Sequence, residues 1–190
     1  FFKQKTAYEM AENNHAILAI NGDYYGFRND GYVIRNGVLY RDVAGNRQDL
    51  VIDADGNFYI IEESEISAQE LLAAGAWQVL SFGPALINNG VIAVSYNSEV
   101  NQSMTSNPRT AIGQVSALHY IVIVSDGRTS QSDGLTLYAL ATLMKDLGCT
   151  VAYNLDGGGS STLWFNGEVI NNPTDGRSDG ERKVSDIVYF

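Results

Sequence analysis

The chain has 190 residues, of which 45% are hydrophobic and 18% charged, a composition typical of a folded globular protein and not of a disordered one. Its 12 basic and 22 acidic side chains give a formal net charge of −10, which argues against binding to nucleic acid or an anionic membrane. The single cysteine, Cys149, excludes an intramolecular disulfide and a cysteine-based zinc cluster, and we predict neither a metal nor a cofactor. No apolar stretch approaches the roughly 20 residues that span a bilayer, so no membrane insertion is expected.

The N-terminal residues differ in character from the rest of the chain. They read FFKQKTAYE, a basic stretch ahead of an acidic remainder. This stretch resembles translated adapter sequence, and a frayed native N-terminus is the alternative. We therefore expect residues 1–9 to be non-native or disordered, and we assign residues 10–190 to a single domain.

The first predicted elements are a strand and two hairpins. Residues 16–20 form an apolar run that predicts a buried strand. Asn36-Gly37 and Asp55-Gly56 each lie between two apolar runs, a position in which such pairs favour type I′ turns. Asn89-Gly90 and Asn166-Gly167 repeat the pattern further along the chain, so we expect four β-hairpins.

Two helices are predicted among the strands. The first is short, because Ser67 and Glu70 form a capping box and Gly75 supplies the stop. The second runs from about residue 133 to residue 147, because apolar residues recur there at helical spacing and Gly148 follows.

The second helix lies between two apolar strands, residues 119–124 and residues 150–155. We expect the three segments to form a right-handed βαβ-like crossover with the two strands as parallel neighbours. The predicted fold class is therefore α+β: a mixed, mostly antiparallel, twisted sheet rich in hairpins, with one long and one short helix and one crossover.

Polar segments lie at the ends of several predicted strands. Residues 125–128 follow the first crossover strand and residues 156–161 follow the second. Residues 21–25 follow the strand at 16–20, and residues 107–110 precede another apolar run. Loops at the carboxyl ends of parallel strands meet at one edge of a sheet, where α/β units bind ligands, so we expect a shared pocket.

The residue types in these loops suit an anionic ligand. A run of three glycines lets the backbone point N–H groups at an anion, although a plain turn has the same sequence and the spacing does not match a nucleotide-binding loop. Asp126 and Asp156 are either catalytic carboxylates or residues that cap a turn. Guanidinium groups bind phosphate or carboxylate well. The arginines in or beside these loops are Arg109, Arg128 and Arg182.

The order of the motifs carries a family resemblance. The motifs are NGDYYG at 21–26, NPRTAIG at 107–113, VSDGR at 124–128, LGC at 147–149, NLDGGGSST at 154–162 and GERKVSD at 180–186. Together they resemble the phosphodiester glycosidase family over residues 10–190, without the strand or strands that usually precede the first motif. The resemblance implies hydrolysis of a sugar-1-phosphodiester, such as α-N-acetylglucosamine-1-phospho-O-R, to free sugar and a phosphomonoester.

The resemblance also suggests a role for each candidate residue. Asp156 is the first choice for the carboxylate that activates water or attacks the anomeric carbon, and Asp126 is the second. Arg109 and Arg128 are assigned to the phosphate. The supporting donors for the phosphate are Gly157, Gly158, Gly159 and Ser160. The residues expected to orient the sugar are Asn21, Asp23 and Asn154, with Tyr24 or Tyr25 as an apolar platform. Arg182 is either a substrate ligand or half of a structural ion pair.

Two other functions remain open. A non-catalytic carbohydrate- or cell-surface-binding module could use the same pocket with aromatic platforms and amides but no activated carboxylate. A calcium-stabilised domain is suggested by acidic residues 175–181, although their spacing does not match an EF-hand and a solvated loop is the simpler interpretation. The expected partner is a small or polymeric sugar-phosphate of a bacterial surface glycan such as an exopolysaccharide. The expected location is secreted or cell-envelope, with no export signal in the printed sequence.

Overall fold

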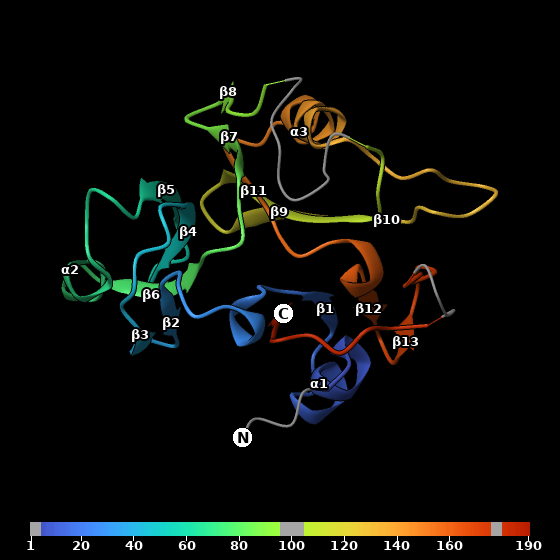
Figure 1. Cartoon of the computed structure of the whole chain (residues 1–190), viewed down its shortest axis with the longest axis horizontal. Coiled ribbons are helices and arrows are strands. Elements are labelled where there is room, and N and C mark those ends of the chain that lie inside the picture. Colours follow the sequence, from blue (N-terminus) through green and yellow to red (C-terminus); the bar gives the residue numbers. More distant parts are fainter. Residues whose placement is uncertain (1–4, 96–104, 176–179) are drawn as a thin grey trace.

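The computed structural model of the chain describes residues 5–95, 105–175 and 180–190. In these residues, fourteen strands form three antiparallel sheets. Three α-helices are present there as well, and each packs against a different sheet (Figure 1). The predicted α+β class with many hairpins is therefore confirmed.

The first sheet has the strand order β13-β12-β1-β14. Its strands are β1 (Leu18–Asn21), β12 (Leu163–Phe165), β13 (Glu168–Val169) and β14 (Ile187–Tyr189). Helix α1 (Ala7–Asn13) packs on this sheet through Ala11, which contacts Ala19 and Trp164. No helix was expected here, although Thr6 and Glu9 form a reciprocal capping box that starts it.

The second sheet has the order β10-β9-β11-β7-β8. Its strands are β7 (Ala85–Asn88), β8 (Val91–Ile92), β9 (Arg109–Ser116), β10 (His119–Ser125) and β11 (Val151–Asn154). Helix α3 (Leu137–Asp146) covers it, with Leu140 and Met144 packed in a cluster with Leu86. The helix begins four residues later than predicted, because Thr136 is its N-cap and accepts the Ala139 N–H at Oγ1 (3.1 Å).

The predicted crossover strands are parallel but are not neighbours. Strands β10 and β11 both run antiparallel to β9, which lies between them. The expectation of adjacent parallel strands is wrong because β9 forms a hairpin with β10 and also pairs with β11. Every pairing in the described residues is therefore antiparallel, and there are three sheets where one mixed sheet was expected.

The third sheet has the order β3-β2-β6-β4-β5. Its strands are β2 (Val33–Arg35), β3 (Val38–Arg41), β4 (Gln48–Asp53), β5 (Phe58–Glu62) and β6 (Ala76–Leu80). Helix α2 (Ala68–Ala73) packs on it, and the predicted capping box of Ser67 and Glu70 is present. Gly75 follows this helix with φ +98°, the left-handed conformation expected of a stop.

All four predicted hairpins form, and three have the predicted turn. Both residues of Asn36-Gly37, Asn89-Gly90 and Asn166-Gly167 have positive φ, as a type I′ turn requires. In Asp55-Gly56 only the glycine has positive φ. The difference arises because Asp53 Oδ1 accepts the N–H groups of Asp55 (2.9 Å) and Asn57 (2.8 Å), which stabilises a longer loop.

The central core lies between the inner faces of the three sheets. It contains Ile20 from the first sheet, Ile112 and Tyr153 from the second, and Leu50 and Leu80 from the third. Each sheet buries its other face under its own helix. Because all three sheets converge on one core, loops that are far apart in the sequence come together at one end of it.

Candidate functional site

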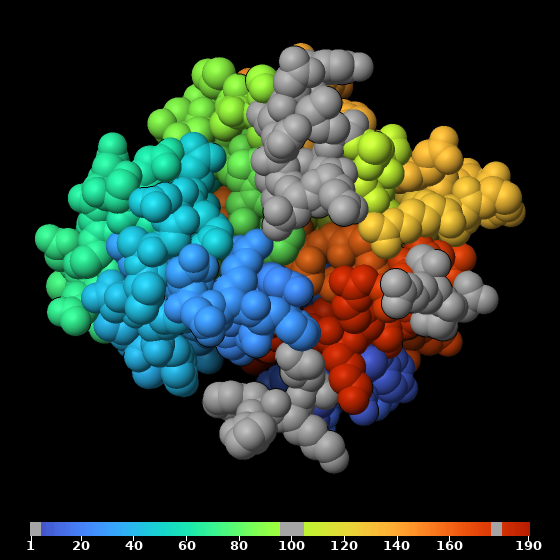
Figure 2. Space-filling model, in the orientation of Figure 1, coloured from blue at the N-terminus to red at the C-terminus, as the bar shows by residue number. Residues whose placement is uncertain are grey.

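Loops from different sheets meet on one face of the molecule. The segment after β1 contains residues 21–25, and the segment after β11 contains residues 156–161. In Figure 2 the blue segment after β1, the orange segment after β11 and the red C-terminal segment adjoin on the face shown. The shared pocket expected from the sequence would form where these segments meet.

Asp156 is the first residue of the segment that follows β11, and it is only 8% exposed. Its N–H donates to Gly22 O (3.2 Å), and its C=O accepts from Asn21 Nδ2 (2.6 Å). Burial raises the pKa of Asp156 to about 6, while the nearby Ser160 hydroxyl, the Gly157 N–H (2.9 Å) and the charge of Arg182 act in the opposite direction. A carboxylate that titrates near neutral pH is typical of acid–base or nucleophilic catalysis.

The glycine loop after Asp156 uses most of its backbone donors internally. Gly158 N–H donates to Pro108 O (2.9 Å), and Ser160 N–H donates to Gly157 O (3.2 Å) within the short 3-10 helix η2 (Gly158–Ser160). With the Gly157 N–H bound to Asp156, three of the four N–H groups of residues 157–160 already have partners. Side chains are therefore better placed than these N–H groups to bind a phosphate.

Polar side-chain atoms beside the loop are buried, and the Ser160 hydroxyl lies near the Asp156 carboxylate and lowers its pKa. Among the described residues, Asn154 Oδ1 and Ser161 Oγ have no hydrogen-bond partner. Asn154 is fixed at its other end, where Nδ2 donates to Gly83 O (2.8 Å). Leaving such atoms unsatisfied costs free energy, so a substrate or water is the natural partner for them.

Two arginines lie beside the glycine loop. Arg128 is exposed and donates from Nε (3.2 Å) and Nη2 (3.0 Å) to Asn107 Oδ1. Its guanidinium lies over Gly158, where a Cβ would approach the two Nη atoms to 3.1 and 3.3 Å. Arg109 is 7% exposed and donates from Nε to Leu135 O (3.0 Å). Burial, and after it the charge of Arg128, lowers the pKa of Arg109 to about 10, so Arg109 is cationic at neutral pH.

Asp126, the second candidate carboxylate, is bound to the segment before residue 175. Its Oδ1 accepts from Asn171 Nδ2 (3.0 Å) and from the Asn172 N–H (2.9 Å). Asn171 Nδ2 also donates to Ser161 O (3.0 Å), so Asp126 lies near the glycine loop. The Asp126 carboxylate therefore holds residues 171 and 172 in place, whereas the Asp156 carboxylate accepts from the adjacent Gly157 N–H.

Asn21 and Asp23 are buried and bound within the protein. Asn21 Oδ1 accepts from Thr110 Oγ1 (2.7 Å) and from the Thr162 N–H (3.2 Å), in addition to the Asp156 contact of its Nδ2. Asp23 is 1% exposed, and its Oδ2 accepts the Ser81 N–H (2.8 Å). The sequence predicted that both side chains orient the sugar, whereas in the structure both are bound by other parts of the chain and hold loops in place.

Tyr24 belongs to an aromatic cluster at the same end of the core. Its ring stacks on Phe27 at a centroid distance of 4.6 Å and meets Phe82 edge-on at 6.4 Å. The Arg28 guanidinium lies over both Tyr24 (5.4 Å) and Phe82 (5.0 Å). Tyr25 starts the 3-10 helix η1 (Tyr25–Phe27) and donates its hydroxyl to Ser185 O (3.0 Å).

Arg182 forms the ion pair that was one of its two predicted roles. Its Nε donates to Asp175 Oδ1 (3.0 Å), and its Nη2 contacts the same oxygen. Its N–H donates to Gly159 O (3.2 Å), which keeps it close enough to lower the pKa of Asp156. Of the acidic segment 175–181 that suggested calcium, residues 176–179 lie outside the described residues, and the described chain contains no cluster of metal-binding side chains.

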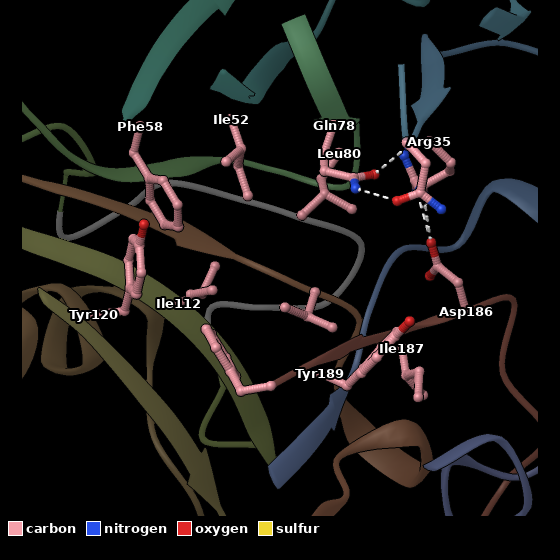
Figure 3. Close-up of a pocket in the computed structure, with 13 residues that line it drawn as sticks. Arg35, Ile52, Phe58, Gln78, Leu80, Ile112, Tyr120, Asp186, Ile187 and Tyr189 are labelled. Atoms are coloured by element: carbon pink, nitrogen blue, oxygen red, sulfur yellow. Dashed lines mark hydrogen bonds and ion pairs between the residues drawn. The ribbon is translucent and has the colours of Figure 1, made fainter. Parts of the chain in front are cut away.

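Arg35 and Asp186 were missed by the sequence analysis. They form an ion pair at one end of a 420 Å³ cavity whose other walls are mostly apolar and include Phe58, Ile112 and Tyr120 (Figure 3). Asp186 closes the motif at 180–186, which was a usable signal. Arg35 ends a hairpin strand and has no motif, so only the structure locates it.

The site combines a buried carboxylate with a pKa of about 6 and two arginines from neighbouring segments, Arg109 at the start of β9 and Arg128 after β10, an arrangement that suits acid–base chemistry on an anionic group. The model of the phosphodiester glycosidase family matches residues 14–190, and the chain belongs to this family. Its described helices include none that is long and apolar enough to cross a bilayer.

The chain is similar to proteins of bacteria and vertebrates. The chain is 34% identical to the SPbeta prophage-derived uncharacterized protein YomE of Bacillus subtilis, over 97% of this chain and 29% of that one. It is 27% identical to N-acetylglucosamine-1-phosphodiester alpha-N-acetylglucosaminidase of Bos taurus, over 86% of this chain and 29% of that one. The zebrafish enzyme of the same name, solved as a catalytic domain auto-inhibited by its pro-peptide, superposes with a TM-score of 0.77 at 25% identity, covering 98% of this chain and 66% of that one. The chain thus spans under a third of the length of these sequence relatives.

Proposed function

We propose that the protein hydrolyses a sugar-1-phosphodiester of the N-acetylglucosamine-1-phosphodiester type to free sugar and a phosphomonoester. The observation that carries the proposal is Asp156, a buried carboxylate with a pKa of about 6, on a loop over which Arg128 lies. The names of the mammalian and zebrafish relatives supply the substrate class.

In the proposed reaction the phosphate is the leaving group. The bond between the anomeric carbon and the phosphate oxygen breaks, its electron pair stays on that oxygen, and positive charge develops on the sugar ring. Asp156, ionised above its pKa, either takes a proton from the attacking water or attacks the anomeric carbon first. Water supplies the new hydroxyl group of the sugar in both cases, and its second proton is released with the phosphomonoester.

The two arginines are proposed to bind the phosphate. Their charges repel each other in the free protein, since Arg128 lowers the pKa of Arg109. A phosphate between them would relieve this repulsion and would gain charge as the bond breaks, so the attraction is strongest in the transition state. We propose supporting contacts from the buried Ser160 hydroxyl and Asn154 Oδ1, and an apolar contact from Tyr24.

The test is incubation of the purified protein with an alkyl ester of α-N-acetylglucosamine-1-phosphate and, separately, with UDP-N-acetylglucosamine. We expect equal amounts of free sugar and phosphomonoester from the wild type, and at least a 100-fold lower rate from Asp156→Asn, which keeps the size of the side chain but cannot ionise. Asp146→Asn is the matched control, because Asp146 is an exposed residue of α3. Full activity of a folded Asp156→Asn variant would contradict the proposal.

A non-catalytic glycan-binding module is the second candidate, and the stack of Tyr24 on the exposed ring of Phe27 is the feature that favours it. Such a module would bind the sugar-phosphate ester without releasing product, and binding would survive Asp156→Asn. Isothermal titration calorimetry with the same ester, run beside the product assay, separates the two functions.

We further propose that the natural substrate is a bacterial surface glycan, for example an exopolysaccharide with phosphodiester-linked sugars, and that the protein acts after secretion or in the cell envelope. The acidic chain with its single cysteine suits that setting. Immunodetection in medium, envelope and cytosol fractions tests the location, and a purely cytosolic signal would contradict it.

A further inference from the structure

Three charged side chains, Arg35, Asp186 and Asp23, form a cluster that joins the first and third sheets. Arg35, at the end of β2, donates to Asp186 Oδ2 from Nε (2.8 Å) and Nη2 (2.7 Å). The same Nη2 lies 3.4 Å from Asp23 Oδ2. Figure 3 shows Arg35 pointing from the third sheet toward Asp186, which lies just before β14 of the first sheet.

The guanidinium of Arg35 is fixed on several sides. Its Nη1 donates to Ile34 O (2.9 Å) and also to Val79 O. The ring of Tyr25 covers it at 5.3 Å. A guanidinium with this many partners cannot rotate without breaking hydrogen bonds, so it fixes the orientation of the Asp186 carboxylate.

Asp186 in turn fixes the segment that follows β1. Its backbone O accepts the Gly22 N–H (3.0 Å), and its Oδ1 accepts the Asp23 N–H (2.7 Å). The fit leaves no room for a side chain on Gly22, because a Cβ there would collide with Asp186 Oδ1. Residues 22 and 23 therefore lie directly on Asp186.

The same segment also holds the main chain of Asp156 in place. Gly22 O accepts the Asp156 N–H (3.2 Å), and Asn21 Nδ2 donates to Asp156 O (2.6 Å). Asp186 and Asp156 thus bind opposite sides of residues 21–23. A shift of Asp186 would be transmitted to Asp156 through only two hydrogen-bonded contacts.

We propose that Arg35 and Asp186 are positioning residues for the reaction: together they fix residues 21–23, and these residues fix the backbone of Asp156 against the anomeric carbon. The inference rests on the proposed function, because it needs Asp156 to act in catalysis. Neither residue is proposed to touch the substrate. Their contribution is geometric, and misplacement of a catalytic group by about 1 Å can cost about 100-fold in rate.

Asp186→Asn is the main test. The asparagine has one oxygen and one NH₂ group, so it cannot accept from both Arg35 and the Asp23 N–H as the carboxylate does. We expect kcat to fall about 10- to 100-fold with KM changed by less than about 2-fold. We also expect the low-pH limb of the rate profile to move to lower pH, because a less firmly held Asp156 gains contact with water. The charged groups that affect Asp156 itself, Arg182 and Asp23, are unchanged in this variant.

The controls separate positioning from general stability. Asp30→Asn removes a more exposed ion pair, with Arg47 (2.9 Å), beside the third sheet, and it should leave kcat and the pH profile unchanged. If Asp186→Asn does not fold, Arg35→Lys is the deciding variant, since it keeps the charge and loses the paired donors. A folded variant that loses only thermal stability, with kcat and the low-pH limb as in the wild type, would overturn the proposal.

A measurement without turnover keeps this inference distinct from the proposed function. In the ¹³C-labelled chain, the Asp156 carboxyl signal is identified by its loss in Asp156→Asn, and its titration midpoint is compared between wild type and Asp186→Asn. A lower midpoint in the variant supports positioning even if no sugar ester is hydrolysed, in which case only the proposed function fails. An unchanged midpoint together with unchanged kcat overturns the positioning role.

Discussion

The chemistry proposed for this protein depends on one carboxylate that is poorly hydrated. Asp156 is buried at the start of the glycine loop, and burial is the largest of the effects on its pKa. The partners that favour its ionised form, chiefly the Ser160 hydroxyl and the Gly157 N–H, only partly offset this effect. The residue is therefore half ionised near pH 6, where an ordinary aspartate is fully charged.

At the residue scale, the raised pKa predicts the pH dependence of activity. A base or nucleophile must be ionised, so kcat/KM should rise with pH around a midpoint near 6 and level off above it. The phosphodiester keeps a single negative charge in this range, so the rise of kcat/KM with pH comes from a group of the protein and not from the substrate. Initial rates from pH 4 to pH 8 provide the measurement. A rate that falls through pH 6 would instead make Asp156 the proton donor.

At the scale of single elements, each helix depends on a local signal at its start. Thr6, Ser67 and Thr136 accept backbone N–H groups at the N-termini of α1, α2 and α3. Helix α3 covers the second sheet, which provides both Arg109 and the strand leading to Asp156. Stability of this helix therefore supports the site indirectly.

We predict that Thr136→Ala lowers the free energy of unfolding by about 1 kcal/mol, because the Ala139 N–H loses its partner. Thr142→Ala is the matched control within the same helix. Thr142 bonds to Tyr138 O on the helix itself, so its loss should be neutral or slightly stabilising, given the higher helix propensity of alanine. Urea denaturation followed by circular dichroism measures both, and equal effects would contradict a capping role.

At the scale of the whole molecule, the three sheets enclose polar groups as well as the apolar core. Asp49 on β4 is fully buried, and neither of its carboxyl oxygens has a hydrogen-bond partner of normal geometry in the described part of the chain. Burial, and after it the negative charge of Glu63, raises the pKa of Asp49 to about 9. The folded protein therefore keeps a proton that the unfolded chain releases at an ordinary pKa near 4.

This difference predicts how stability depends on pH. Between the two pKa values the folded state binds more protons than the unfolded state, so stability from this group is fully present at low pH and is lost as pH rises, by about 1.4 kcal/mol per pH unit. Asp49→Asn removes the titration. The stability of the variant relative to that of the wild type should therefore be higher at pH 8 than at pH 6. Urea denaturation at both values tests this, with Asp146→Asn as control. Parallel pH dependences of wild type and Asp49→Asn would show that Asp49 is ionised in the fold.

Local signals in the sequence determined much of the protein: the hairpin positions, the Ser67 capping box and the order of the motifs. These features depend on residues within a few positions of one another, whose turn, capping and spacing preferences are read directly from the chain. The capping box of Thr6 and Glu9 is an equally local signal, although no helix was predicted from it.

Only the tertiary structure decided how these elements combine. It placed β9 between β10 and β11, divided the strands among three sheets, and brought Arg35 to Asp186 across 151 positions of sequence. It also showed that Asn21 and Asp23 hold loops in place, because their neighbours come from distant segments. The physical reason is the same in each case: pairing and burial between distant segments depend on how sheets pack around the shared core, and no local pattern encodes that choice.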